Sequence, residues 1–131
     1  MQLGKFEIWQ GLGGGGFGVV YRALDRQLDR IVAIKVLHNE LMVNRTLVDR
    51  FKQEARLAAS LDHPNLVSVY EFGEIQGYYY IEMAYMAGGS LKELLQRTGA
   101  LHPETALNLI TQLANGLGYA HINNIIHLDL K

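Results

Sequence analysis

The sequence predicts an α+β fold in which a small β-rich lobe precedes a group of helices. Residues 5–83 contain five short runs of β-branched and aromatic residues, typical of strands, and one segment with helical periodicity. Beyond residue 90 the hydrophobic periodicity is helical up to about residue 123. The 131 residues, of which 49% are hydrophobic and 19% charged, suit one globular domain or part of one.

The five expected strands form the first part of the chain. They occupy residues 5–12, 18–24, 31–37, 66–72 and 78–83. A glycine-rich segment joins the first two strands, which predicts a hairpin there. Helical periodicity predicts a helix over residues 46–61, between the third and fourth strands. Its buried stripe is expected to consist of Leu47, Phe51, Glu54, Ala58 and Leu61, at steps of four and three residues.

Two further helices are expected after a short connector at residues 87–90. Ser90 is a suitable N-cap for a helix over 91–97. Pro103 is expected to be the first residue of a longer helix that ends at Asn123 and Asn124, since Asn tolerates the left-handed conformation of a helix end. The apolar stripe of this helix is expected to consist of Ala106, Leu109, Ile110, Leu113, Leu117 and Ala120.

Charge and cysteine content exclude several classes of function. Twelve basic and thirteen acidic residues give a net charge of −1, which offers no case for binding nucleic acid or an anionic membrane. The absence of cysteine excludes disulfides, thiol catalysis and metal sites that need sulfur. The sequence begins without a signal-peptide pattern. It also contains no apolar run close to the length of roughly 20 residues that spans a bilayer, so we expect a cytoplasmic location.

The glycine-rich segment offers a candidate phosphate-binding loop. Gly13, Gly15, Gly18 and Val20 fit the pattern G-x-G-x-x-G-x-V, although a flexible hairpin turn explains that pattern about as well. The strand expected after the loop argues against a dinucleotide-binding motif, which needs a helix there. The Gly-Lys-Ser/Thr ending of a Walker A loop is absent too. A hairpin loop that could fold over phosphates remains, with Phe17 at its tip.

Lys35 and Glu54 are each expected on an apolar face. Lys35 alternates with Ala33 and Leu37 on the third strand, and Glu54 lies within the expected stripe of the helix. Taken singly, each could be a solvated lysine or a glutamate at the rim. An isolated buried charge is costly, however, and two opposite charges misplaced in this way predict an ion pair between them.

These features resemble the eukaryotic-type protein kinase family. Residues 32–35 (V-A-I-K) match its third strand, and Glu54, 19 residues after Lys35, stands where the glutamate of its αC helix belongs. Residues 63–67 (H-P-N-L-V) match the segment after that helix. Residues 127–131 (H-L-D-L-K) match H-R-D-L-K at the start of its catalytic loop. The motifs follow the order of the family along the whole chain. The sequences of residues 62–74 and 83–91 are most similar to those of bacterial members.

The resemblance implies that ATP is the cofactor. Its phosphates would be covered by a loop of Gly13, Gly14, Gly15, Gly16, Phe17 and Gly18, and Leu12, just before that loop, would also bind the nucleotide. Lys35 would bind the α- and β-phosphates and would be held by Glu54. Val20 and Ala33 would enclose the adenine. Met83 would be the gatekeeper, and the Ala84 carbonyl and Met86 N–H would read the adenine edge.

The resemblance also implies the chemistry, which is phosphoryl transfer from ATP to Ser/Thr hydroxyls of a protein substrate. Asp129 would orient the substrate hydroxyl and Lys131 would neutralise the transferring phosphate, so that Asp129, Lys131 and Lys35 are the expected catalytic residues. Leu128 replaces the arginine of H-R-D, which in many members pairs with a phosphorylated activation loop. The magnesium ligands of the family lie beyond Lys131, and no metal ligand is expected in this chain.

We therefore expect an incomplete protein kinase domain over residues 1–131. About 1–85 would be the small lobe, with a five-stranded antiparallel sheet, an αC helix and the hinge. About 86–131 would be the start of the helical lobe, with its helix 103–123 partly unburied. The chain alone is expected to bind nucleotide weakly without turnover. The alternative is a non-catalytic nucleotide-binding or protein-interaction module that retains a kinase small lobe.

Overall fold

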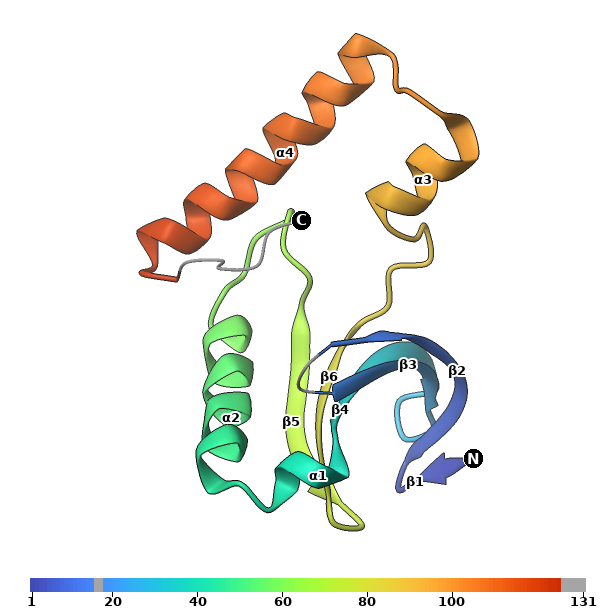
Figure 1. The fold of residues 1–131 in the computed structure, drawn as a ribbon, viewed down its shortest axis with the longest axis vertical. Helices are drawn as coiled ribbons and strands as arrows, with labels where there is room; N and C mark the ends of the chain where they lie inside the picture. Colours follow the sequence, from blue (N-terminus) through green and yellow to red (C-terminus); the bar gives the residue numbers. More distant parts are fainter. Residues whose placement is uncertain (16–17, 126–131) are drawn as a thin grey trace. The chain divides into compact units, whose positions relative to one another are not determined.

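The computed structural model describes residues 1–15 and 18–125, and those residues form six strands and four helices (Figure 1). In chain order the elements are β1 (Gln2–Leu3), β2 (Phe6–Gly14), β3 (Gly18–Asp25), β4 (Arg30–Leu37), α1 (Asn39–Met42), α2 (Arg45–Ala59), β5 (Val69–Ile75), β6 (Tyr78–Ala84), α3 (Leu91–Thr98) and α4 (Pro103–Ile122). The five predicted strands and three predicted helices are present, although the fourth strand, predicted over 66–72, lies three residues later, at Val69–Ile75. Strand β1 and helix α1, of two and four residues, are too short to show periodicity in a sequence.

The strands form one antiparallel sheet in the order β1-β2-β3-β4-β6-β5. The sheet is strongly curled, as the close approach of residues from its two edges shows. Lys5, in the turn between β1 and β2, lies 2.6 Å from Glu71 on β5. Beside it, a Cβ added to Gly4 would lie 2.7 Å from the Ile75 side chain, also on β5. Gly4 has a φ of +55°, a conformation that suits glycine.

The chain divides into two compact units. The first comprises Met1–Ser60 and Ser68–Tyr85 and holds the sheet with α1 and α2. The second comprises Leu61–Val67 and the chain from Met86 on, and holds α3 and α4. No described helix is at once long enough and apolar enough to span a bilayer.

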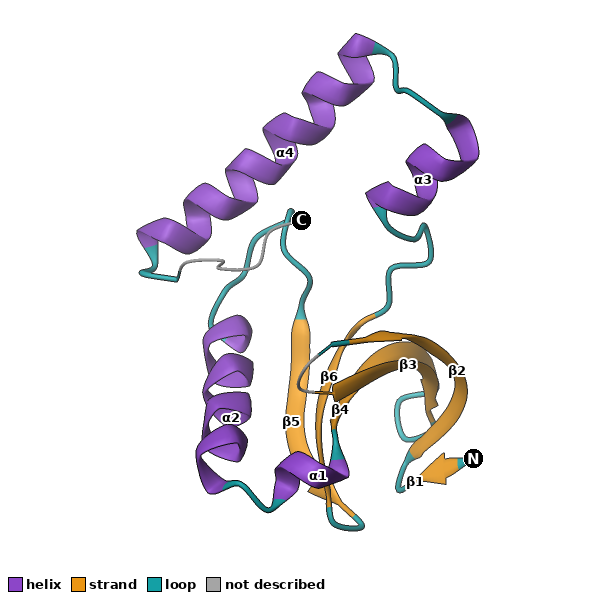
Figure 2. Ribbon diagram, viewed as in Figure 1, coloured by secondary structure: helices purple, strands orange, loops and turns teal. Residues whose placement is uncertain are grey.

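The first unit has a hydrophobic core on each face of its sheet. One core consists of Leu3, Phe6, Ala23, Val32, Ile34 and Tyr80. The other lies beneath α2, which runs beside β5 (Figure 2), and consists of Leu37, Val48, Phe51, Ala55 and Ile81. Of the stripe predicted for this helix only Phe51 is buried. Leu47 and Ala58 are half-buried, Glu54 is exposed, and Leu61, half-buried too, lies beyond the end of the helix. The buried residues are Val48, Phe51 and Ala55, at steps of three and four residues.

The second unit confirms the helices predicted for it. The Ser90 hydroxyl accepts a hydrogen bond from the Glu93 N–H (3.1 Å) and caps α3. Pro103 begins α4, which the His102 side chain caps, and Asn124 follows the helix with φ +64°. The predicted exposure of the apolar stripe is confirmed only in part: Ile110 is 62% and Leu113 48% exposed, whereas Leu109 and Leu117 are half-buried and Ala120 is buried.

Candidate functional site

Strand β4 places Lys35 on the face of the sheet that also packs against α2. Lys35 lies opposite Val20 on β3 and Ile81 on β6. Residues directly opposite each other in an antiparallel pair point to the same face, so these three side chains share one surface. Ala33, two residues earlier, lies opposite Met83 and extends that surface along the strands.

The predicted ion pair between Lys35 and Glu54 is confirmed. The Nζ atom of Lys35 lies 3.0 Å from Oε1 of Glu54, which reaches over from α2. The Glu54 side chain is 52% exposed, so the expectation of a buried glutamate was wrong, because the helix buries Phe51 and Ala55 on either side of it. An ion pair this accessible to water contributes at most about 1 kcal/mol to folding, and its main effect is to fix the position of the ammonium group.

The glycine-rich loop connects β2 and β3 as a hairpin. The N–H of Gly15 donates to the carbonyl of Gly18 (3.0 Å), and the imidazole Nε2 of His38 lies 3.3 Å from the carbonyl of Gly15. Gly13 has a φ of +139°, which disfavours a side chain. A Cβ on Gly18 would collide with the carbonyl of Val36, so the backbones of β3 and β4 approach too closely for another residue.

The residues assigned to adenine, apart from Met86, belong to the first unit. Val20, Ala33 and Met83 share the face that carries Lys35, as expected from the strand pairing. The N–H of Ala84 donates to the carbonyl of Ser68 (2.9 Å). Leu12 is 43% exposed at the end of β2. Met86 belongs to the second unit. Four residues of the predicted site, Gly16, Phe17, Asp129 and Lys131, lie outside the described residues.

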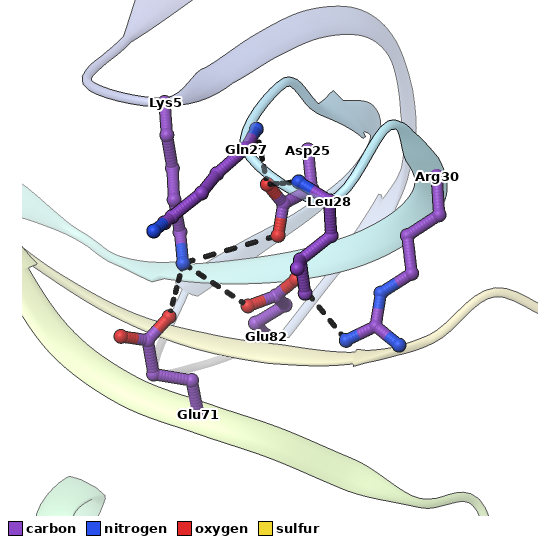
Figure 3. Close-up of polar contacts among 7 residues, drawn as sticks. All are labelled: Lys5, Asp25, Gln27, Leu28, Arg30, Glu71 and Glu82. Atoms are coloured by element: carbon purple, nitrogen blue, oxygen red, sulfur yellow. Dashed lines mark hydrogen bonds and ion pairs between the residues drawn. The ribbon is translucent and has the colours of Figure 1, made fainter.

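The opposite face of the sheet holds a cluster of charges that the sequence analysis did not identify (Figure 3). Asp25 and Glu82 are buried, with 0% and 2% of their side chains exposed. The Lys5 ammonium lies 3.8 Å from each of these carboxylates and 2.6 Å from Glu71. Arg30 lies 4.0 Å from Glu82. One signal of this cluster was present in the sequence. Glu82 lies on the same side of its strand as Tyr78 and Tyr80, where an apolar residue is normally found.

The pKa values of the two buried carboxyl groups shift in opposite directions. Burial raises the pKa of Glu82 to about 7, and the hydrogen bond and charge of Asp25 act in the same direction. Burial also acts to raise the pKa of Asp25, but its hydrogen bonds with Glu82, Leu28 and Gln27 hold that pKa below its ordinary value. The N–H groups of Gln27 and Leu28 donate to Asp25 Oδ1 at 2.9 and 3.2 Å. A proton shared by the pair therefore resides on Glu82.

Comparison with known proteins places this chain in one family. The protein kinase domain family matches residues 6–131. The serine/threonine-protein kinase PrkC of Bacillus subtilis is 45% identical over 128 residues, which are 98% of this chain and 20% of PrkC. PknD of Mycobacterium tuberculosis is 36% identical over 130 residues, which are 99% of this chain and 20% of PknD. The chain thus spans about a fifth of the length of these curated relatives.

A solved structure agrees with the sequence matches. A mutant form of the Mycobacterium tuberculosis PknI kinase domain superimposes with a TM-score of 0.78 at 28% identity, covering 100% of this chain and 54% of that one. The antiparallel sheet with a helix beside it is the fold of a protein kinase small lobe. The chain belongs to the protein kinase domain family. Its relatives named above are serine/threonine kinases of bacteria.

Proposed function

We propose that this chain is the ATP-binding part of a serine/threonine protein kinase, which transfers a phosphoryl group from ATP to hydroxyls of a protein substrate. The observation that carries the proposal is the 3.0 Å contact between Lys35 and Glu54. It joins strand β4 to helix α2 and holds a cation at the edge of an apolar surface. In kinases the lysine of this pair binds the nucleotide phosphates, and the pair must be formed in the active state.

The described residues fit an adenine nucleotide. Val20, Ala33 and Met83 offer an apolar surface for a planar base, and Lys35 follows on the same face at the distance of two strand residues from Ala33. We assign the adenine edge to the Ala84 carbonyl and the Met86 N–H. The hairpin loop from Leu12 to Gly18 would present backbone N–H groups to the phosphates.

The catalytic assignments extend the proposal to the end of the chain. Asp129 would orient the substrate hydroxyl and accept its proton, and Lys131 would neutralise charge on the transferred group. Magnesium, when bound, would neutralise the β- and γ-phosphates. We expect its ligands among residues that this chain does not supply, because the chain covers 54% of the kinase domain to which its structure was compared. We therefore expect nucleotide binding without turnover.

Titration of the chain with a fluorescent ATP analogue tests this proposal. We expect weak, saturable binding that Lys35→Met reduces by about tenfold or more, since the variant removes the cation that meets the phosphates. Lys92→Met is the matched control, because it removes the same charge from helix α3. Binding that Lys35→Met leaves unchanged would contradict the phosphate site. Formation of phosphoprotein by the chain, lost in Asp129→Asn, would instead contradict the expected lack of turnover.

A further inference from the structure

Arg22 of strand β3 stacks between two aromatic rings that come from other segments. Its Cζ atom lies 5.2 Å from the ring centroid of Trp9 on β2 and 5.4 Å from that of Tyr85, which follows β6. The Nε atom of Arg22 is buried and has no hydrogen-bond partner among the described residues. The two aromatic rings are therefore the neighbours on which the guanidinium lies in the described structure.

A β-bulge explains how Trp9 reaches this position. Ile8 lies opposite Ala23 and Gln10 lies opposite Arg22, so that Trp9 is an extra residue in β2 without a partner in β3. Bulges redirect a side chain relative to the regular alternation of a strand. Here Ile8 packs against the core on one face, while the Trp9 ring lies against Arg22.

The position of Arg22 connects this stack to the adenine site. Arg22 lies opposite Ala33, so its side chain points to the face that carries Val20, Ala33 and Lys35. Tyr85 directly follows Ala84, whose N–H is bound to the Ser68 carbonyl at 2.9 Å. Ala84 is thus held by Ser68, just before β5, and by its pairing with Val32 on β4, whereas Tyr85, the next residue, contacts Arg22.

We propose that Arg22 is a positioning residue which, by stacking between Trp9 and Tyr85, holds the backbone that reads the adenine edge. This role rests on the proposed function, because it concerns the same nucleotide site. Arginine suits it better than lysine, since the planar guanidinium is weakly hydrated and can stack on two rings at once. Removing the stack should let Tyr85 and the backbone that follows Ala84 move, and so weaken recognition of the base without affecting the phosphates.

Calorimetric titration of the chain with ATP and with inorganic tripolyphosphate separates these two effects. Each cation–π contact corresponds to about a two- to fivefold change in an equilibrium constant. We expect Arg22→Met and Tyr85→Leu each to weaken ATP binding by about that factor, with tripolyphosphate affinity unchanged. Tyr85→Phe keeps the ring and should bind ATP like the unsubstituted chain. Arg26→Met, which removes the same charge from the exposed turn between β3 and β4, is the matched control.

Trp9 provides a second measurement, because it is the only tryptophan of the chain. Its emission spectrum should change in Arg22→Met and not in Arg26→Met. If Arg22→Met does not fold, Arg22→Lys takes its place. It keeps the charge, and its loss of ATP affinity should be smaller than that of Tyr85→Leu. Unchanged ATP affinity in Arg22→Met, or an equal loss for both ligands, would overturn the positioning role while ATP binding by the unsubstituted chain stands. Failure of the unsubstituted chain to bind ATP would overturn the proposed function, and this role with it.

Discussion

Replacing Glu82 by glutamine should remove most of the pH dependence of folding stability between about pH 4.5 and pH 7. In the folded chain the pKa of Glu82 is about 7, whereas the ordinary value is 4.5. Over this interval the folded chain keeps a proton that the unfolded chain has released. The contribution of Glu82 to stability is therefore fully present below about pH 4.5, falls as the pH rises, and is lost above about pH 7.

The magnitude follows from the difference between the two pKa values. A separation of about 2.5 pH units, at about 1.4 kcal/mol per unit, corresponds to on the order of 3 kcal/mol. The groups that face Glu82 are Lys5, Asp25, Arg30 and Glu71, and they include both signs of charge. Glutamine has the shape of protonated Glu82 and can still donate to Asp25. Glu82→Gln should thus match the parent near pH 4.5 and exceed its stability at pH 8 by up to about 3 kcal/mol.

Urea unfolding followed by Trp9 emission measures this effect in the unit that contains the cluster, because Trp9 lies in the same unit. Glu74→Gln is the matched control, since Glu74 lies exposed on β5. We expect the control to keep the slope of the parent. If Glu82→Gln also keeps that slope, Glu82 does not hold the proton and the account of the buried pair is wrong.

Three further predictions concern packing and the ion pair. Glu54→Gln should lower the free energy of unfolding by no more than about 1 kcal/mol, because the pair is exposed, and yet should weaken binding of a fluorescent ATP analogue. Gly18→Ala should lower the melting temperature, at a cost of about 1–3 kcal/mol, because its Cβ would collide with the backbone of β4, whereas Gly15→Ala meets no atom within 4 Å and should not. In urea titrations Phe51→Ala should cost about 3–5 kcal/mol and Ile110→Ala, at a 62% exposed position, within about 0.5 kcal/mol. Equal losses of stability for Gly18→Ala and Gly15→Ala, or for Phe51→Ala and Ile110→Ala, would contradict the described packing.

The elements of this fold could be predicted because their patterns are local. The β-branched run over Arg30–Leu37 and the period of Pro103–Ile122 each lie within one segment of sequence. The face of Arg45–Ala59 was less certain from sequence, because apolar residues occur on two adjacent stripes, and only contact with the sheet selects Val48 and Ala55 over Leu47 and Ala58.

The candidate site shows the same limit. The pairing of Lys35 with Glu54 could be predicted, since each charge lay in an apolar pattern, although the exposure of Glu54 could not. The stack on Arg22 depends on a shift of strand register at Trp9, which a sequence does not reveal. Asp25 and Glu82, which form the buried pair, are 57 residues apart in the sequence, and neither residue belongs to a motif.

The curl of the sheet bears on how the chain avoids aggregation. A sheet edge normally offers unpaired N–H and C=O groups to a strand of another molecule. Here one edge strand, β5, is approached by Gly4 and Lys5 from the turn next to the other edge. Strand β5 also carries two exposed acidic residues, Glu71 and Glu74. A second copy that added its own β5 alongside would bring like charges together and would have to displace the ion pair of Lys5 with Glu71. The bent sheet thus protects an edge that a flat one would leave open to strand addition.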